Sequence, residues 1–78
     1  MKLIEILQEI HPQFDFEKSK DFFADGLIDS FDLTRLIGAL EEAYGISIKG
    51  EDLKAENFRS LASITEMLER YGVKQAIS

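Results

Sequence analysis

Ser30 is the residue of this chain whose type and position best suit chemistry. It follows Asp29 and opens segment 30–44, where apolar residues recur at helical spacing. Asp29 is a favourable N-cap and Gly45 a favourable residue just past a helix end, so the pattern predicts a helix over 30–44. Unpaired N–H groups and the positive end of the dipole would favour a phosphate attached in its first turn. The simpler alternative is that Ser30 is only a second capping residue.

Other sites of chemistry find little support. The chain has no cysteine, which removes disulfides, cysteine-based zinc sites and a thiol nucleophile. Its one histidine is His11, and no Gly-x-Ser-x-Gly motif surrounds Ser30, so a hydrolytic triad is not supported. His11 is expected to be structural or exposed. Segment 21–32 superficially resembles a calcium loop, but Phe23 stands at a ligand position and Asp32 replaces the final glutamate. We therefore expect no catalytic residue and no metal site.

The predicted 30–44 helix has one apolar stripe and one unusual exposed face. The stripe expected to face the core comprises Leu33, Leu36, Ile37, Leu40 and Tyr44. The exposed face comprises Phe31, Thr34, Arg35, Gly38 and Glu42, within an acidic rim of Asp29, Asp32, Glu41 and Glu42. An apolar point inside a charged rim is typical of a contact patch. Gly38 is either tolerated at a cost of about 1 kcal/mol relative to alanine, or lets a partner backbone approach closely.

The remaining segments predict an all-α fold, a small bundle of three main helices plus one short helix with a long first loop. The first helix covers 2–10, and the connection 11–29 is too apolar to be free, so it should lie against the core. After Gly45, an anchored loop leads to a short helical turn within 51–58. Ser60 should cap a last helix that reaches Tyr71. We expect a single domain over 1–78, with its core at about 2–72 and a fraying tail at 73–78.

Composition and charge limit the classes of partner. Nine basic residues against 15 acidic ones give a net charge of −6, of which −5 lies within 25–56. This balance argues against binding a nucleic-acid backbone and favours basic protein surfaces. No segment is long and apolar enough to span a bilayer, and the first ten residues lack the apolar region of a signal peptide. We expect a cytoplasmic monomer.

The sequence also resembles the acyl carrier protein family. The resemblance rests on Asp25-Gly-Leu-Ile-Asp-Ser-Phe-Asp-Leu, followed by Leu36, Leu40, Glu41-Glu42, Tyr44-Gly45-Ile46 and Ile48, and it covers roughly residues 3–71. It implies that Ser30 receives 4′-phosphopantetheine from coenzyme A, with Asp29 as its flanking acid. It also implies a docking face on the same helix, made of Phe31, Asp32, Thr34, Arg35, Gly38, Glu41 and Glu42.

The resemblance implies a carrier rather than an enzyme. The arm would hold acyl intermediates as thioesters for fatty acid, polyketide or related biosynthesis. Expected partners are a phosphopantetheinyl transferase, an acyl or aminoacyl ligase, and downstream synthases or transferases with basic docking surfaces. A fatty cargo could insert among Ile37, Leu40, Ile48 and Leu61, although these residues also suit a plain core.

Two alternatives to a fatty-acid carrier remain open at this point. Phe31 stands where fatty-acid carriers usually have leucine, and it looks more like some D-alanyl or other aminoacyl carriers. Arg35 also interrupts the acidic face, and Gly38 replaces a bulkier contact residue. The other alternative is an unmodified acidic helical domain that binds a partner through Phe31.

Overall fold

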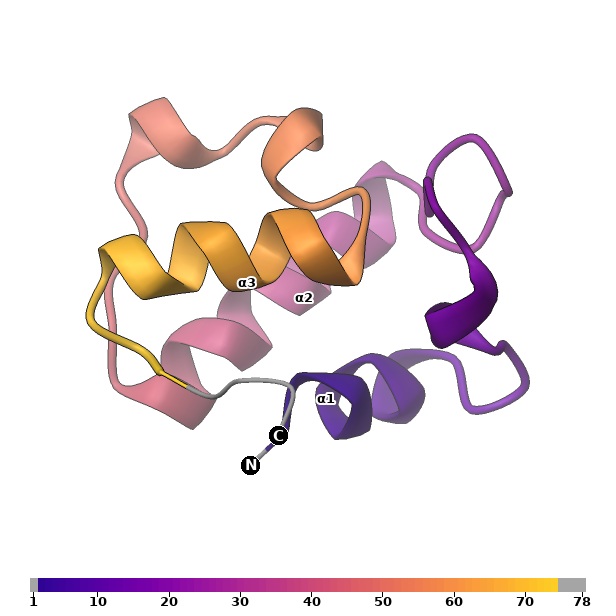
Figure 1. The fold of residues 1–78 in the computed structure, drawn as a ribbon, viewed down its shortest axis with the longest axis horizontal. Helices are drawn as coiled ribbons and strands as arrows, with labels where there is room; N and C mark the ends of the chain where they lie inside the picture. Colours follow the sequence, from indigo (N-terminus) through magenta and orange to yellow (C-terminus); the bar gives the residue numbers. More distant parts are fainter. Residues whose placement is uncertain (1, 75–78) are drawn as a thin grey trace.

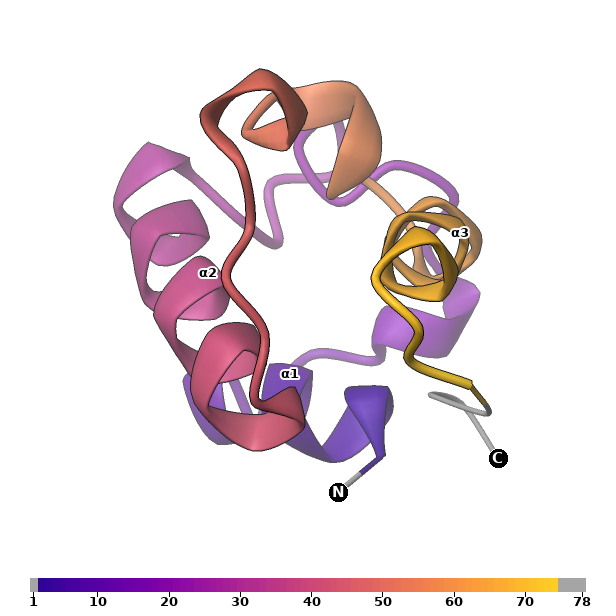
Figure 2. The same ribbon diagram turned by 90° about the vertical axis from the view of Figure 1, so that its left-hand side faces the viewer.

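Helices and turns make up the secondary structure of the part of the chain that the structure describes. The computed structural model describes residues 2–74, and within them it contains the α-helices α1 (Leu3–Ile10), α2 (Ser30–Tyr44) and α3 (Leu61–Arg70). The described residues include no strand, which confirms the predicted all-α class. Figures 1 and 2 show α2 and α3 on opposite sides of the interior, with α1 across one end and the connection between α2 and α3 across the other.

The connections contain three short 3₁₀ turns within the described residues. They are η1 (Phe16–Lys18), η2 (Gly50–Asp52) and η3 (Ala55–Asn57). The short helical segment expected over 51–58 is therefore divided into two single turns. The Asn57 side chain donates to the carbonyl of Asp52 at 2.9 Å and joins these turns. The η1 turn had no counterpart among the predicted elements.

The predicted caps set the ends of α2 and α3. The Asp29 carboxylate accepts from the Asp32 N–H at 2.8 Å, and Ser60 Oγ accepts from the Ser63 N–H at 3.1 Å. Gly45 ends α2 in the left-handed conformation, with φ of 64°, which an L side chain adopts only with strain. These contacts satisfy donors and acceptors that the helix ends leave unpaired.

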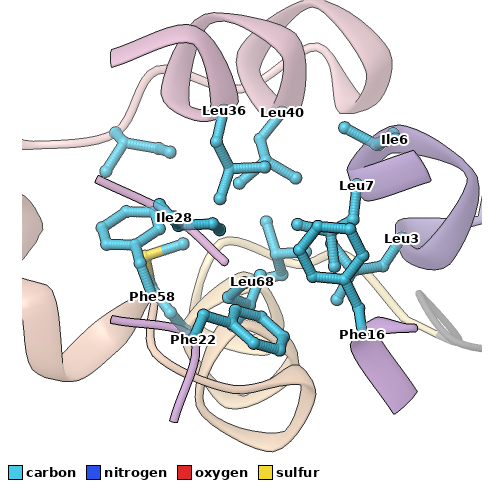
Figure 3. Packing of buried hydrophobic residues seen from close by; sticks show 13 residues of the cluster. Leu3, Ile6, Leu7, Phe16, Phe22, Ile28, Leu36, Leu40, Phe58 and Leu68 are labelled. Carbon is cyan, nitrogen blue, oxygen red and sulfur yellow. The ribbon is translucent and has the colours of Figure 1, made fainter. Parts of the chain in front are cut away.

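The core lies between the three helices and draws on every connection (Figure 3). Its buried members are Leu3, Ile6, Leu7, Phe16, Phe22, Ile28, Leu36, Leu40, Ile48, Phe58, Ile64, Met67 and Leu68. The predicted stripe of α2 faces this core: Leu36 and Leu40 are fully buried, and Leu33, Ile37 and Tyr44 pack against it at its edge.

The long first connection is pinned to the core, as predicted. Phe16 and Phe22 are fully buried, and their rings meet edge to face with centroids 5.2 Å apart. The Phe22 N–H also donates to the Arg59 carbonyl at 2.6 Å, just before α3 begins. The connection that leads to Ser30 is thus held by two buried aromatic rings and by a backbone hydrogen bond to the residue before Ser60.

The loop after α2 is anchored, and the end of α3 helps to hold it. Ile48 is buried, and the Tyr71 hydroxyl donates to the Asp52 carboxylate while accepting from the Lys49 N–H at 3.0 Å. Val73, the first residue of the expected tail, packs against the core at its edge. The fraying expected farther on concerns residues 75–78, which lie outside the described residues.

Candidate functional site

Ser30 is the first residue of α2, and its side chain is exposed. Within the described residues its hydroxyl forms no hydrogen bond. Capping of α2 is carried out by Asp29, so the alternative that Ser30 is a second capping residue is not supported. The chain therefore presents a free hydroxyl at the N-terminus of its longest described helix.

Two backbone donors lie at the same helix end. No described residue accepts a hydrogen bond from the N–H groups of Ser30 or Phe31, whereas the N–H groups of Asp32 and Leu33 both donate to Asp29. Unpaired first-turn N–H groups are a favourable environment for an anion. The site is therefore suited to a phosphate ester on the Ser30 side chain, even though Asp29 lies beside it.

Asp32 corrects the predicted acidic rim. It was expected on the exposed side, but only 8% of the residue is exposed. Its carboxylate accepts from His11 Nε2 at 2.8 Å and from the Asp29 N–H at 3.3 Å. The hydrogen bond from His11 lowers the pKa of Asp32, opposed by burial and aided by the Asp29 N–H. Asp32 therefore fixes the start of α2 and does not offer a free charge to partners.

His11 takes the structural role that was one of its two expected roles. It is half-buried, it follows α1 directly, and its ring centroid lies 5.2 Å from that of Phe14. Through Asp32 it joins the end of α1 to the start of α2. The sequence did not predict this pair, because 21 positions separate the two residues. Helical periodicity predicts only contacts between residues of the same helix.

The exposed face of α2 otherwise matches the prediction. Phe31 is 74% exposed, and Thr34, Arg35, Gly38 and Glu42 are exposed as well. The Thr34 hydroxyl donates to the Ser30 carbonyl at 3.2 Å. Nothing lies within 4 Å of the place where a side chain on Gly38 would begin. A large apolar side chain thus stands in solvent next to the free hydroxyl.

Glu41 differs from the rest of the rim, because it is half-buried. Its Oε2 atom accepts from the Ile48 N–H at 2.9 Å and so holds the loop after α2. Glu41 therefore braces the fold, whereas Glu42, one residue later, is exposed and makes no salt bridge with a described residue.

The residues considered as a lining for fatty cargo lie in or against the core. Leu40 and Ile48 are buried, and Ile37 and Leu61 pack at the edge. A hollow of about 390 Å³ lies elsewhere, between α1 and α2, and is lined by Ile6, Glu9, Ala39, Glu42 and Ala43. None of the four expected lining residues borders this hollow.

Residues 2–74 contain neither a metal-binding cluster of side chains nor a helix suited to span a membrane. There, no three histidine, cysteine or acidic side chains are grouped so that they could hold a metal ion. The Asp25 carboxylate accepts from Ser19 Oγ at 2.6 Å, and Asp21 accepts from two backbone N–H groups of its own turn. In the same residues, no helix has the length and apolar character needed to cross a bilayer.

Comparison with protein families gives a match that covers most of the chain. Residues 1–68 match the family model described as phosphopantetheine attachment site. Neither the comparison with curated proteins nor the comparison with solved structures gives a match.

Proposed function

Since the chain belongs to the phosphopantetheine attachment site family, whose members are non-catalytic carriers, we propose that Ser30 is the residue that bears the 4′-phosphopantetheine group. The proposal is supported above all by one observation: Ser30 has an exposed hydroxyl, without a hydrogen bond to a described residue, at the N-terminus of α2. When attached, the group supplies a terminal thiol that can hold an acyl or aminoacyl cargo as a thioester.

The other described serines suit this role less well. Ser19 donates its hydroxyl to Asp25, and Ser60 and Ser63 are engaged with each other in the cap of α3. Ser47 is exposed but lies in the loop after α2, outside the first turn of any described α-helix. Only at Ser30 do a free hydroxyl and unpaired first-turn N–H groups of an α-helix coincide among the described serines.

We further propose that partner enzymes dock on the exposed face of α2 beside Ser30. The face is formed by Phe31, Thr34, Arg35, Gly38 and Glu42, with Asp29 at its edge. Phe31 supplies an apolar anchor, and the net charge of −6 attracts basic surfaces. The partners are the phosphopantetheinyl transferase, the ligase that loads the arm, and the enzymes that take the cargo, met by a monomer in the cytoplasm.

For the cargo we favour an aminoacyl or short acyl group over a long fatty chain. Leu40 and Ile48, which a long chain would have to displace, are 0% and 7% exposed and belong to the packed core. Phe31 also resembles the residue of some aminoacyl carriers at this position. A loading screen with aminoacyl and acyl ligases tests this preference, and exclusive loading of long fatty acids would refute it.

The attachment site is tested by incubating the unmodified protein with coenzyme A and a broad-specificity phosphopantetheinyl transferase. Intact mass should increase by one phosphopantetheine group in the wild type and in Ser47→Ala, and it should not change in Ser30→Ala. Because the chain has no cysteine, a thiol assay gives an independent signal that comes only from the added group. An unmodified wild type would instead favour the unmodified interaction domain.

A further inference from the structure

The hollow between α1 and α2 is formed where two helix faces meet. Ile6 and Glu9 are three residues apart on α1, while Ala39, Glu42 and Ala43 share one face of α2 at spacings of three and four. The fully buried Ile6 side chain and the two alanines give it an apolar floor. The small alanine side chains leave a volume of about 390 Å³ open to solvent.

Within residues 2–74, no cation pairs with either of the two glutamates that border this hollow. Described salt bridges occupy other acids, as in the pairs Arg35–Asp32 and Arg70–Asp52. No described residue forms a hydrogen bond or salt bridge with Glu9 or Glu42, and both residues are exposed. The hollow therefore combines an apolar floor with two unneutralised carboxylates in a chain that already carries a net charge of −6.

We propose that this groove is a second docking site, which binds a long basic side chain, arginine or lysine, presented by a partner enzyme. The apolar stem lies on Ile6, Ala39 and Ala43, and the cationic head lies by Glu9 and Glu42. Such side chains combine an aliphatic stem with a charged end, and a guanidinium has enough donors to serve both carboxylates.

The position of the groove on α2 fits a partner that is already docked near Ser30. Glu42 belongs both to the exposed face and to the groove, so the two surfaces are continuous. Ala39 to Ala43 lie nine to 13 residues after Ser30, which at 1.5 Å per residue is roughly 14–20 Å along the helix axis. An enzyme that engages Phe31 could therefore reach the groove with the same surface. In this respect the inference rests on the proposed function, because it assumes partner enzymes.

The groove is tested by NMR titration of the unmodified protein with the peptide acetyl-Leu-Arg-amide. We expect concentration-dependent shifts confined to the groove residues, and much weaker shifts with acetyl-Leu-citrulline-amide, in which a neutral urea group of similar size replaces the guanidinium. In Glu9→Gln/Glu42→Gln the dissociation constant should rise roughly two- to fivefold for each carboxylate removed. Ala43→Leu should weaken binding without any change of charge, because it fills the floor.

The control is Glu66→Gln/Glu69→Gln, which removes two exposed carboxylates from α3. Its net charge equals that of the groove variant Glu9→Gln/Glu42→Gln. It should bind the arginine peptide like the wild type. Equal shifts with the citrulline peptide, or equal loss of affinity in both double variants, would overturn the proposal.

Coenzyme A-dependent mass gain, measured on the same wild-type sample, reports separately on Ser30. A modified protein whose groove does not bind refutes only the groove, and a groove that binds in an unmodifiable protein refutes only the carrier assignment.

Discussion

Phe31 and Asp32 are neighbours in the chain, yet their side chains have opposite environments. Phe31 is 74% exposed, whereas Asp32 is 8% exposed. Helical periodicity predicts the first placement, because Phe31 lies nearly opposite the apolar stripe. It does not predict the second, since Asp32 turns back to the Asp29 N–H and meets His11, which comes from a distant part of the chain. The sequence therefore predicted the exposure of Phe31 but not the burial of Asp32, which depends on a polar partner from a distant segment.

Replacing Phe31 by alanine should weaken docking without weakening the fold. Because the side chain is largely in solvent, its loss costs little core contact, and the free energy of unfolding should change by less than about 0.5 kcal/mol. The KM for modification by the transferase should rise, by roughly fivefold or more if the ring is an anchor. Kinetics of mass gain and urea unfolding measure the two effects. An unchanged KM would show that this enzyme does not use Phe31.

Gly38 is either merely tolerated in α2 or needed for the close approach of a partner backbone, and one substitution separates these two explanations. A side chain added there meets nothing within 4 Å, and the residue lies inside α2, so Gly38→Ala should raise the free energy of unfolding by roughly 1 kcal/mol. Thermal and urea unfolding measure that gain. If the partner backbone approaches closely, the same variant should raise the KM of the transferase. A stabilised variant with wild-type kinetics would mean that the glycine is merely tolerated.

At the scale of elements, the start of α2 is held by a reciprocal cap and by the contact between His11 and Asp32. Asp29 and Asp32 each accept from the other's N–H, and His11 connects the pair to α1. These contacts fix the backbone on both sides of Ser30. The position of the attachment site thus depends on a contact between two elements and not on α2 alone.

This arrangement predicts a pH-dependent contribution to stability. The pKa of Asp32 in the folded protein lies below its ordinary value of 3.8, chiefly because His11 donates to the carboxylate. A depressed folded-state pKa stabilises the fold above the unfolded-state pKa, and this contribution is lost as pH falls through the folded-state pKa. Asp32→Ala should therefore be less stable than the wild type by roughly 1–2 kcal/mol at neutral pH. The difference should shrink below about pH 4.

Urea unfolding of both proteins across this pH range measures the effect. Glu69→Gln serves as the control, since Glu69 is exposed and forms no described salt bridge. Its difference from the wild type should be small at every pH. A deficit of Asp32→Ala that persists undiminished in acid would mean that the ionised carboxylate is not the source of the stabilisation.

The caps could be predicted from the sequence, but the η1 turn and the division of segment 50–57 into two turns could not. Asp29, Gly45 and Ser60 carry local signals, because each satisfies helix ends with its own side chain or backbone conformation. The η2 turn is instead held by contacts from elsewhere in the chain. In particular, Tyr71 at the end of α3 binds both Asp52 and the Lys49 N–H. Such contacts leave no periodic pattern within the segment that they shape.

At the scale of the whole molecule, the sequence indicated the three α-helices of the described residues and their apolar faces, but not how α1 and α2 lie against each other. His11 follows α1 and meets Asp32 near the start of α2, while Ile6 and Glu9 share a groove with Ala39 and Ala43 farther along α2. The two helices therefore run in roughly opposite directions. The groove exists because of this placement, so no single-helix pattern could have predicted it.

The uneven distribution of charge over the molecule should affect how partners approach, because most of the net charge lies in one part of the chain. Segment 25–56 carries −5 of the total −6, and it contains α2 with Ser30 and the exposed face. Attraction of a basic partner by this charge should raise the association rate more than it slows dissociation. Raising the ionic strength from about 0.01 M to about 1 M shortens the screening length from roughly 30 Å to roughly 3 Å.

Association of the transferase with the unmodified Ser30→Ala protein should therefore slow by about tenfold or more over this salt range, while dissociation changes less. Stopped-flow fluorescence measures both rates. In Glu9→Gln/Glu42→Gln the salt dependence should be shallower, because two negative charges are gone. If the association rate did not change with salt and only the dissociation rate rose, the prediction would be wrong. Docking would then depend mainly on the apolar contact at Phe31 and not on the charge of the molecule.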